Sequence, residues 1–369
     1  MKELRIKDIC DKGSSNLKQK DVEGKNGLYP VYGASGIISH IDTYHQEANY
    51  IAIVKDGSGI GRVTFMPAKS SVIGTMQYIL PKDGFNINYI GYCLQSLDLS
   101  KYKQGAAIPH IYFRDYGERV VKVTEDINEQ QSIVDYLDSA FAKIDAMKAN
   151  AEKALNEAKA LFQASLKEML EPKEGWEEKA LGDICSDIRY GTSTPSHENG
   201  EYKYLRMNNI TNDGFLDVSH YKTISLPEKE LEKCLVKRGD IIFNRTNSRE
   251  LVGKSCVFTE DENMVIAGYL IRIRLKEGFE PQFITYSMNF QRSLGLFQHL
   301  IVGAVHQANI SANNIQKVII NYPPISEQKS IVATLDSLKS KVDRLQANYE
   351  KIYQECDALK QAILRQVFE

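Results

Sequence analysis

The chain carries two copies of one long segment, and this duplication restricts its architecture more than any other feature of the sequence. The segment of about 43 residues that begins at Glu129 aligns without a gap with the segment that begins at Glu327, at an offset of 198 residues. About half of the aligned positions are identical. Shorter matches lie upstream, such as the pair Gly105-Ala106, which returns at Gly303-Ala304. Self-similarity of this length predicts two structural units of one design.

Each repeated segment is predicted to form one long amphipathic helix. In both copies, apolar residues recur at alternating spacings of three and four, which is the pattern of a coiled-coil seam. A helix of this length measures roughly 65 Å at about 1.5 Å per residue, and its apolar stripe needs a partner. The predicted seam positions are Leu137, Ile144, Ala151 and Ala158, with Ala140, Met147, Ala154 and Leu161 between them, and Leu335, Leu338, Val342, Leu345, Tyr349, Ile352 and Leu359.

The two stripes favour antiparallel pairing within the chain, because small side chains in the middle of the first helix then face larger ones in the middle of the second. The duplication also supplies a ready pseudo-two-fold axis for this pairing. Two alternatives are that each helix packs on its own globular core and that the helices pair between two chains. Residues 125–171 hold ten acidic residues against five lysines, so this part of the chain is expected to repel polyanions.

The segments that precede the repeats are predicted to be mixed α/β domains. Runs of β-branched and aromatic residues predict strands near 50–54, 71–73 and 78–80 in the first segment, and near 240–243, 254–258 and 269–274 in the second. One helix is expected near 88–100, and its counterpart near 281–294. The predicted fold class is α+β: two mixed α/β domains separated by two long helices that pair as an antiparallel coiled coil, with pseudo-two-fold symmetry. The predicted boundaries are 1–124 for the first domain, 125–171 for the first long helix, 172–324 for the second domain and 325–369 for the second long helix.

Composition excludes several classes of protein. No stretch approaches the roughly 18 apolar residues that a membrane-spanning helix needs, and residues 1–8 lack the apolar core of a signal peptide. The six cysteines form no CxxC pair, so they predict neither a zinc site nor a disulfide framework. A cytoplasmic protein with reduced thiols is expected. The net charge of −2 argues against a strongly basic coat over the whole surface but leaves local basic patches open.

The motifs of catalytic sites are missing from the sequence. The run Asp56-Gly-Ser-Gly-Ile-Gly61 looks like a glycine-rich nucleotide loop, but such a loop must begin a helix, and here a strand-like segment follows. We therefore interpret it as a hairpin turn. The prolines Pro323 and Pro324 are expected only to precede the second long helix. The isolated histidines His110 and His306 are interpreted as polar loop residues rather than metal ligands. The chain is not expected to be an enzyme or to hold a cofactor or metal of its own.

A basic, polar loop in the second domain suggests nucleic-acid recognition. Residues 233–255 carry a net charge of +4, and the hexapeptide Asn244-Arg-Thr-Asn-Ser-Arg249 directly follows a predicted strand. Arginine pairs with guanine, asparagine or glutamine with adenine, and hydroxyls serve bases or phosphates. A solvated hairpin is the alternative interpretation. The candidate DNA contacts are Lys55, Arg62, Lys101, Lys103, Gln104, His110, Arg114, Arg189, Tyr190, Thr192, Arg206, Asn208, Asn244, Arg245, Asn247, Ser248, Arg249, Lys254, His306 and Gln307.

This layout resembles the specificity subunit of type I restriction–modification systems. The similar segments include Gly239-Asp-Ile-Ile-Phe-Asn-Arg-Thr-Asn-Ser248, Tyr29-Pro-Val-Tyr-Gly-Ala-Ser-Gly36, Trp176 ahead of Leu181-Gly-Asp-Ile184, and Pro323-Pro-Ile-Ser-Glu-Gln328. The alternation of two variable domains with two duplicated helices is more specific than any one of these segments. One departure is that residues 123–130 lack the paired prolines of the second copy, so the start of the first long helix is expected to differ.

The resemblance implies a non-catalytic subunit that recognises double-stranded DNA as a bipartite, asymmetric target, with one half contacted by each domain. It also implies association with two methyltransferase subunits and two ATP-dependent restriction and translocase subunits. S-adenosylmethionine, ATP and Mg²⁺ belong to those partners. The long helices are then expected to hold the two domains about one DNA turn apart and to fix the spacer between the half-sites.

Two other functions stay open on the sequence alone. One is a two-domain adaptor that binds proteins and has no role with nucleic acid. The other is the DNA-recognising portion of a fused restriction and methylation enzyme, against which the missing methyltransferase motifs count. In none of these functions is a membrane partner expected.

Overall fold

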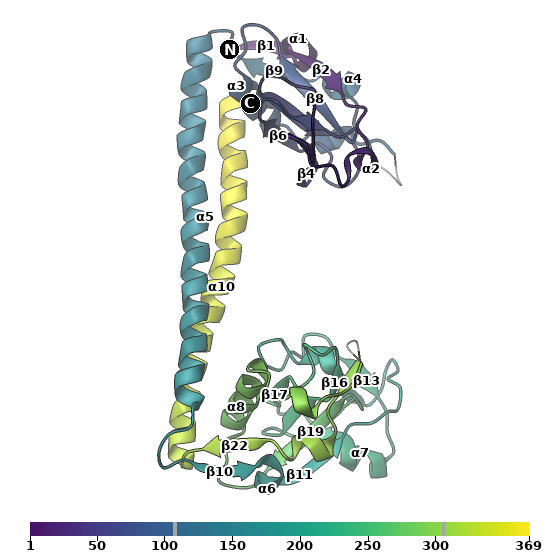
Figure 1. Ribbon diagram of the computed structural model, residues 1–369, viewed down its shortest axis with the longest axis vertical. Helices are drawn as coiled ribbons and strands as arrows, with labels where there is room; N and C mark the ends of the chain where they lie inside the picture. The colour runs from purple at the N-terminus through teal and green to yellow at the C-terminus, as the bar shows by residue number, and fades with distance from the viewer. Residues whose placement is uncertain (106–108, 305–306) are drawn as a thin grey trace. The chain divides into compact units, whose positions relative to one another are not determined.

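The computed structural model describes residues 1–105, 109–304 and 307–369, and it divides into two compact units (Figure 1). The first unit contains Met1–Lys153 and Ala347–Glu369, and the second contains Ala154–Gln346. Each unit therefore combines one α+β domain with parts of both long helices, α5 (Ile127–Leu170) and α10 (Ile325–Phe368). Among the described residues, no helix is long and apolar enough to cross a membrane.

The first unit is built from short strands around one helix of ten residues, α3. Its elements in chain order are β1 (Lys2–Arg5), α1 (Ile6–Ile9), β2 (Cys10–Ser14), α2 (Gln19–Val22), β3 (Tyr29–Gly33), β4 (Gly36–Ile41), β5 (Tyr50–Val54), β6 (Val63–Met66), β7 (Ser71–Val72), β8 (Met76–Pro81), α3 (Ile87–Ser96), η1 (Leu99–Tyr102), α4 (Phe113–Tyr116) and β9 (Val120–Val123). The strands form sheets of order β2-β8-β5-β6, β4-β3-β7 and β1-β9. The glycine-rich run after β5 leads into the antiparallel partner β6, as a hairpin turn requires.

The second unit repeats this plan and adds elements to it. They are β10 (Glu177–Ala180), α6 (Leu181–Ile184), β11 (Cys185–Tyr190), β12 (Tyr202–Leu205), η2 (Met207–Asn209), β13 (Lys222–Ile224), α7 (Glu228–Cys234), β14 (Leu235–Val236), β15 (Ile241–Asn244), β16 (Thr246–Asn247), β17 (Ser255–Val257), β18 (Met264–Ile266), β19 (Leu270–Leu275), α8 (Pro281–Ser293), η3 (Gln298–Leu300), β20 (Val302–Ala304), β21 (Gln307–Asn309), α9 (Ala312–Ile315) and β22 (Ile319–Tyr322). The sheet β11-β19-β15-β17 has the strand order of β2-β8-β5-β6, and β10-β22 corresponds to β1-β9. The α+β class predicted from the sequence is confirmed.

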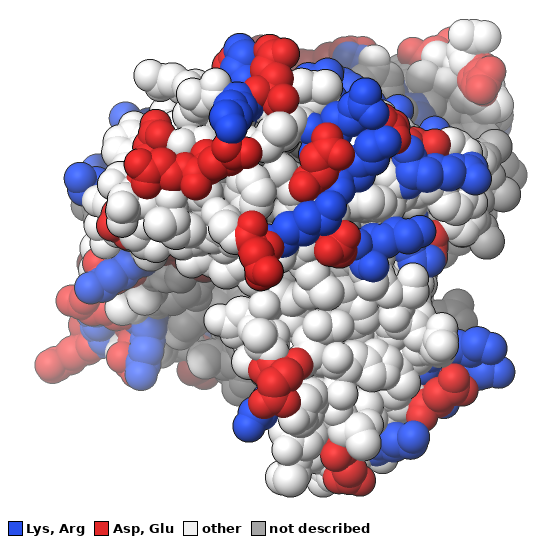
Figure 2. Space-filling view, turned by 90° about the horizontal axis from the view of Figure 1, so that it is seen from above, with Lys and Arg blue, Asp and Glu red and all other residues white. Residues whose placement is uncertain are grey.

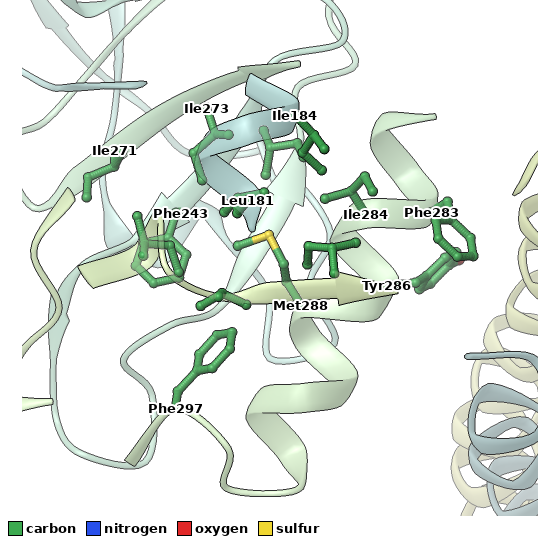
Figure 3. Packing of buried hydrophobic residues seen from close by; sticks show 14 of the residues in the cluster. Leu181, Ile184, Phe243, Ile271, Ile273, Phe283, Ile284, Tyr286, Met288 and Phe297 are labelled. Atoms are coloured by element: carbon green, nitrogen blue, oxygen red, sulfur yellow. The ribbon is translucent and has the colours of Figure 1, made fainter. Parts of the chain in front are cut away.

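The core of the second unit lies between the central sheet and helix α8. Ile241 and Phe243 on β15 pack with Ile271 and Ile273 on β19, and the two strands are antiparallel neighbours. From α8, Ile284 and Met288 turn toward them, whereas Phe283 lies on another side of the helix beside Tyr286 (Figure 3) and packs edge-on against the Trp176 ring. The side chains of the four strand residues and of Phe283, Ile284 and Met288 are fully removed from water, and burying each one contributes roughly 1.5–3 kcal/mol.

A buried glutamine fixes the start of each long helix in the same way. In the first unit, the Gln130 side chain accepts from Asn86 N at 2.7 Å and donates to Thr124 O at 3.0 Å. In the second, Gln328 accepts from Glu280 N at 2.9 Å and donates to Pro323 O at 2.8 Å. The expectation that the first helix would start differently for want of prolines is wrong, because the glutamine makes the attachment and both copies keep it.

A tyrosine–aspartate pair makes the next attachment. Tyr92 on α3 donates to Asp138 on α5, and Tyr286 on α8 donates to Asp336 on α10 at 2.6 Å. One helical turn of each long helix is thus tied to the single longer helix of its domain. Both aspartates belong to the repeated segment and both tyrosines match upstream, so this contact is part of the duplicated design.

The long helices are antiparallel within each unit. In the first unit, Lys148 on α5 contacts Asp357 on α10, and Asp145 on α5 contacts Lys360 on α10. Later residues of α5 therefore contact earlier residues of α10, as in an antiparallel pair. In the second unit, Lys159 Nζ donates to Gln346 Oε1 at 2.8 Å. This pairing was predicted from the repeat and is confirmed.

In α5, the seam between the helices differs from the predicted one at every second predicted position. Ala140, Met147, Ala154 and Leu161 were expected there, but Met147 and Leu161 are 55% and 59% exposed. The following residues face the seam instead, including the buried Leu155 and Phe162. The prediction for Leu359 is also wrong, because this side chain is 47% exposed. The neighbouring Lys360 lies over the Phe141 ring at 5.3 Å and covers that part of the seam.

Candidate nucleic-acid interface

The central strand of each unit ends at an equivalent position that carries a basic residue. Lys55 follows β5 and Arg245 follows β15. Lys55 N donates to Thr75 O and Arg245 N donates to Tyr269 O, both at 3.0 Å.

In each unit, a segment that follows the 3-10 helix, η1 or η3, forms a backbone hydrogen bond with this basic residue. Ile111 N donates to Lys55 O and Ile310 N donates to Arg245 O, both at 2.9 Å. The backbone is therefore the same at the two positions, and only the side chains differ. We call these two places the strand-end sites.

In the second unit, Arg245 is held on three sides. Its Nη2 donates to Asn309 Oδ1 at 2.8 Å, its Nη1 donates to Gly268 O at 3.3 Å, and its guanidinium carbon lies 4.8 Å from the centre of the Tyr190 ring. No carboxylate in the described part of the chain forms an ion pair with it, and its Nε is buried without a hydrogen-bond partner there. The site thus presents a half-buried positive charge that lacks a counter-charge.

Main-chain hydrogen bonds bring several separate segments to the edge of the sheet at which Arg245 lies. Tyr190 and Tyr269 are 42% and 52% exposed. Thr192 O accepts from Gly268 N at 2.7 Å, which places residue 192 at the same edge. Ala267 N donates to Leu205 O at 2.9 Å, so Arg206 follows directly beside this edge. The structure therefore brings together the predicted residues Tyr190, Thr192, Arg206 and Arg245.

In the first unit, the strand-end site contains charges of both signs. Lys55 Nζ lies 2.9 Å from Asp56 Oδ2, and His110 Nδ1 contacts the other oxygen of this carboxylate. The backbones of Gln104 and His110 pair with each other at 2.8 Å in both directions. This site therefore offers acceptors as well as donors.

Aromatic stacking extends the first site. The His110 ring stacks on Tyr112, with 6.2 Å between the ring centres, and Arg114 lies 4.7 Å from the centre of the same tyrosine ring. Gln104 Nε2 donates to Asp115 Oδ2 at 2.8 Å. The predicted residues Lys55, Gln104, His110 and Arg114 therefore meet at one place.

Three other candidates of the first unit are exposed, and two of them contact other residues. Arg62 Nη1 donates to Ala34 O at 2.8 Å, and Lys101 lies 3.9 Å from Asp98. Lys103 is exposed. No contact between these side chains and the first strand-end site is found in the described part of the chain.

Two candidates of the second unit are interior residues, and their prediction as DNA contacts is wrong. Asn244 is fully buried, because β15 extends one residue further than its apolar run. Lys254 is 5% exposed, and its Nζ donates to Ile210 O at 2.8 Å and to Asn212 Oδ1 at 3.3 Å. Burial lowers the pKa of Lys254, which is the expected effect when an ammonium group loses its hydration.

The remaining candidates of the second unit make contacts with other residues or are exposed. Arg189 pairs with Asp187 at 2.8 Å, and Arg249 Nε donates to Gln298 Oε1 at 3.0 Å. The side chain of Asn247 accepts from Ser248 N at 2.8 Å. Asn208 is exposed. His306 and the side chain of Gln307 lie outside the described residues.

Sequence reasoning missed Asn309, Tyr269 and Tyr112. The first two become visible when Ile310 is aligned with Ile111 and Gly268 with Gly74, because the neighbouring residues then fall at equivalent positions. The offset is 199 residues for the isoleucines and 194 for the glycines, whereas the helix repeat has an offset of 198. These residues were therefore missed because they lie upstream of the long helices, where the two copies match only weakly.

Elsewhere in the first unit, several basic side chains form ion pairs with acidic ones. Figure 2 shows Lys and Arg lying next to Asp and Glu on the face that it draws. Arg5 and Lys7 both contact Glu118, and the hydrogen bond from Lys7 holds the pKa of this carboxyl below its usual range. Within the described residues, no three His, Cys, Asp or Glu side chains form a group that could hold a metal ion.

Two α+β units of one design, each with a polar strand-end site and parts of two antiparallel helices, define a duplicated recognition protein. Comparison with known families makes the assignment specific. The model for the type I restriction modification DNA specificity domain matches residues 1–157 and 173–354, so the chain belongs to that family.

Individual relatives agree with this assignment. The specificity subunit of the type I restriction enzyme EcoKI from Escherichia coli is 26% identical over 256 residues, which cover 65% of this chain and 55% of the relative. The chain thus spans about half the length of the curated relatives that it matches. A chain from a solved type I restriction–modification complex matches with a TM-score of 0.74 at 18% identity, over 98% of this chain and 96% of the other. The HsdS subunit from Thermoanaerobacter tengcongensis has a TM-score of 0.58 at 16% identity, over 98% and 95%.

Proposed function

We propose that this chain is the DNA-recognition subunit of a type I restriction–modification complex and that each unit contacts one half of a bipartite, asymmetric target. The observation that carries the proposal is the pair of strand-end sites, where one backbone arrangement presents Lys55, Asp56 and His110 in the first unit and Arg245 with Asn309 in the second. A shared position with different chemistry suits two unlike half-sites. Residues 1–124 and 172–324 form the recognition domains in this proposal, and residues 125–171 and 325–369 form the helices that connect them.

The chemistry of modification and restriction belongs to partner subunits in this account. We assign to them two methyltransferase and two ATP-dependent restriction subunits, together with S-adenosylmethionine, ATP and Mg²⁺. Exposed apolar side chains on the long helices offer contacts for such partners. Tyr136 and Met147 on α5 are both 55% exposed, and Tyr353 on α10 is 48% exposed.

Binding of defined duplexes tests the proposal. The full chain, combined with its methyltransferase partner, is titrated with fluorescent duplexes whose candidate half-sites come from a random library, at fixed moderate salt. We expect selection of one motif with two unlike halves, and loss of binding when the spacer changes by one base pair. Because phosphate contacts alone give affinity without sequence preference, a matched duplex with scrambled halves is the control.

The same experiment separates the alternatives. A protein adaptor would bind its protein partner and leave the library unselected. The DNA-recognising part of a fused enzyme would select a motif without needing a separate methyltransferase. Either result contradicts the proposed role as a separate specificity subunit.

A further inference from the structure

We infer that Arg245 contacts a guanine in the half-site of the second unit, and that Asn309 and Tyr190 are positioning residues that fix its guanidinium for this contact. The inference rests on the proposed function, because it names the base and the residues through which the second strand-end site recognises DNA.

The hydrogen bonds of Arg245 leave the donors that guanine requires. A guanidinium has five N–H groups, two on each terminal nitrogen and one on Nε. Nη1 uses one on Gly268 O and Nη2 uses one on Asn309 Oδ1, while Nε is buried. One N–H therefore remains on each terminal nitrogen. Guanine presents two acceptors in the major groove, O6 and N7, and so can take both of these donors.

The charge of Arg245 points to a partner outside the described chain. Further along the same sheet, Arg272 and Arg274 on β19 are paired with Asp187 and Asp240. Arg245 contacts only neutral groups among the described residues: a carbonyl, an amide and a tyrosine ring. A half-buried cation without a carboxylate costs free energy in the free protein. An electronegative base edge, with phosphates nearby, offsets that cost on binding.

Tyr190 and Asn309 are themselves fixed, which makes the arginine preorganised. The Tyr190 hydroxyl accepts from Ala312 N at 2.8 Å, so the ring under the guanidinium is anchored at the start of α9. Asn309 ends β21, and its backbone pairs with Thr246 directly after Arg245. An arginine that is already oriented loses little conformational freedom when it binds.

The first unit shows that this arrangement is specific to one half-site. His110 occupies the position of Asn309, since each directly precedes the isoleucine that donates to the strand-end residue. His110 contacts Asp56 rather than the basic residue, and Lys55 is neutralised by the same carboxylate. The first site therefore lacks a free two-pronged donor at this position, and the guanine contact belongs to the second unit alone.

Three variants test the inference in the complex of the full chain with its methyltransferase partner. Arg245→Lys keeps the charge and removes the planar fork. Asn309→Leu removes the acceptor at similar size, and Asn309→Asp restores an acceptor oxygen. The readout is the base preference at every position of both half-sites, measured by selection from a duplex library, together with total affinity and the thermal midpoint of each variant.

We expect the wild-type motif to contain a guanine in the second half-site. Arg245→Lys should reduce discrimination at that guanine by about tenfold or more and leave the first half-site unchanged. Asn309→Leu should relax the same position, and Asn309→Asp should keep the preference. His110→Leu is the matched control, because it should alter only the first half-site.

Three results would overturn the inference. A wild-type motif whose second half has no guanine excludes the contact. Equal weakening on all sequences by Arg245→Lys shows a phosphate contact. Unchanged preference in Asn309→Leu, with a normal thermal midpoint, shows that Asn309 does not position the arginine. A wild type that selects no bipartite motif at all instead contradicts the proposed function, so the two failures are distinguishable.

Discussion

At the scale of single residues, the strand-end sites show how one backbone position can carry two chemistries. The Lys55 ammonium is a compact charge neutralised by Asp56, whereas the Arg245 guanidinium is stacked on Tyr190 and is not paired with any carboxylate of the described chain. In the proposed function, substitution at such positions is expected to change recognition without changing the fold, because the backbone hydrogen bonds do not depend on the side chain. Recognition can therefore diverge between two copies of one domain.

Tyr89 allows a residue-scale prediction on stability. Burial raises the pKa of its hydroxyl from 10.0 to about 12, and the hydroxyl accepts from Thr124 N at 3.0 Å. The folded state keeps this proton at a pH where the unfolded state has lost it. The contribution of Tyr89 to stability is therefore complete below pH 10 and is lost as the pH rises toward 12.

The variant Tyr89→Phe should lower the free energy of unfolding by about 1 kcal/mol at neutral pH, because Thr124 N loses its acceptor. Its stability should then decline less steeply than that of the wild type between pH 10 and 12. Urea unfolding across this range measures both effects. Parallel curves for the two proteins would contradict the assignment.

The residue-scale predictions from sequence failed where a polar side chain lies inside a covered sheet. Asn244 directly follows an apolar run, and a strand that stops there would expose it. The strand instead continues through Asn244, with both faces covered. Nothing local distinguishes such a residue from an exposed one, since its burial is decided by tertiary neighbours such as Lys254, whose amine bonds the 210–212 loop.

At the scale of elements, each long helix is joined to its domain by a duplicated set of contacts. The buried glutamine satisfies two backbone groups, and about two turns later an aspartate accepts from the tyrosine of the domain helix. These positions lie in the best-kept part of the repeat. The sequence therefore predicted the helices well, and the hydrogen bonds explain why those residues match.

Removing one of these glutamines should destabilise one unit selectively. Gln328→Leu leaves Glu280 N and Pro323 O without their partner, and two such groups cost about 2–6 kcal/mol when buried. Denaturant unfolding, followed by protection of each unit from hydrogen exchange, should show the loss in the second unit only. Gln130→Leu should do the same in the first unit.

The exposed Gln354 provides the control, because Gln354→Leu removes a glutamine from α10 without a buried partner. Its unfolding free energy should match that of the wild type within about 0.5 kcal/mol. Equal destabilisation by Gln354→Leu and Gln328→Leu would show that the buried glutamine has no special role.

The seam shows why helix phase was harder to predict than helix existence. In α5 both Ala154 and Leu155 are apolar, and likewise both Leu161 and Phe162, so spacings of three and four fit the sequence equally well. The structure buries Leu155 and Phe162. The larger side chains fill the space between the helices, and a pattern of apolar and polar positions does not take side-chain volume into account.

At the scale of the whole molecule, both long helices continue from one unit into the other, because α5 and α10 each cross the boundary between the two units. In the proposed function, their length sets the spacer between the two half-sites. Seven residues added to each helix preserve the spacing of the seam and lengthen it by about 10 Å.

Such a paired insertion, placed between Lys148 and Lys159 in α5 and between Gln346 and Asp357 in α10, should lengthen the preferred spacer by about three base pairs at roughly 3.4 Å each. Duplexes that differ only in spacer length measure the preference. Insertion into one helix alone is the control, and it should destabilise the protein because the contacts on its far side lose register. An unchanged spacer after the paired insertion would show that the helices do not set it.

The central claim is that two unlike sites, one in each unit, together define one DNA target. Genome-wide mapping of methylated adenines tests it most directly, in cells that carry the chain with its methyltransferase partner and in matched cells that lack only the chain. The account predicts one chain-dependent motif with two different halves and a constant spacer, and a change confined to one half in Arg245→Lys. Methylation that does not depend on the chain, or a single uninterrupted motif, would contradict it.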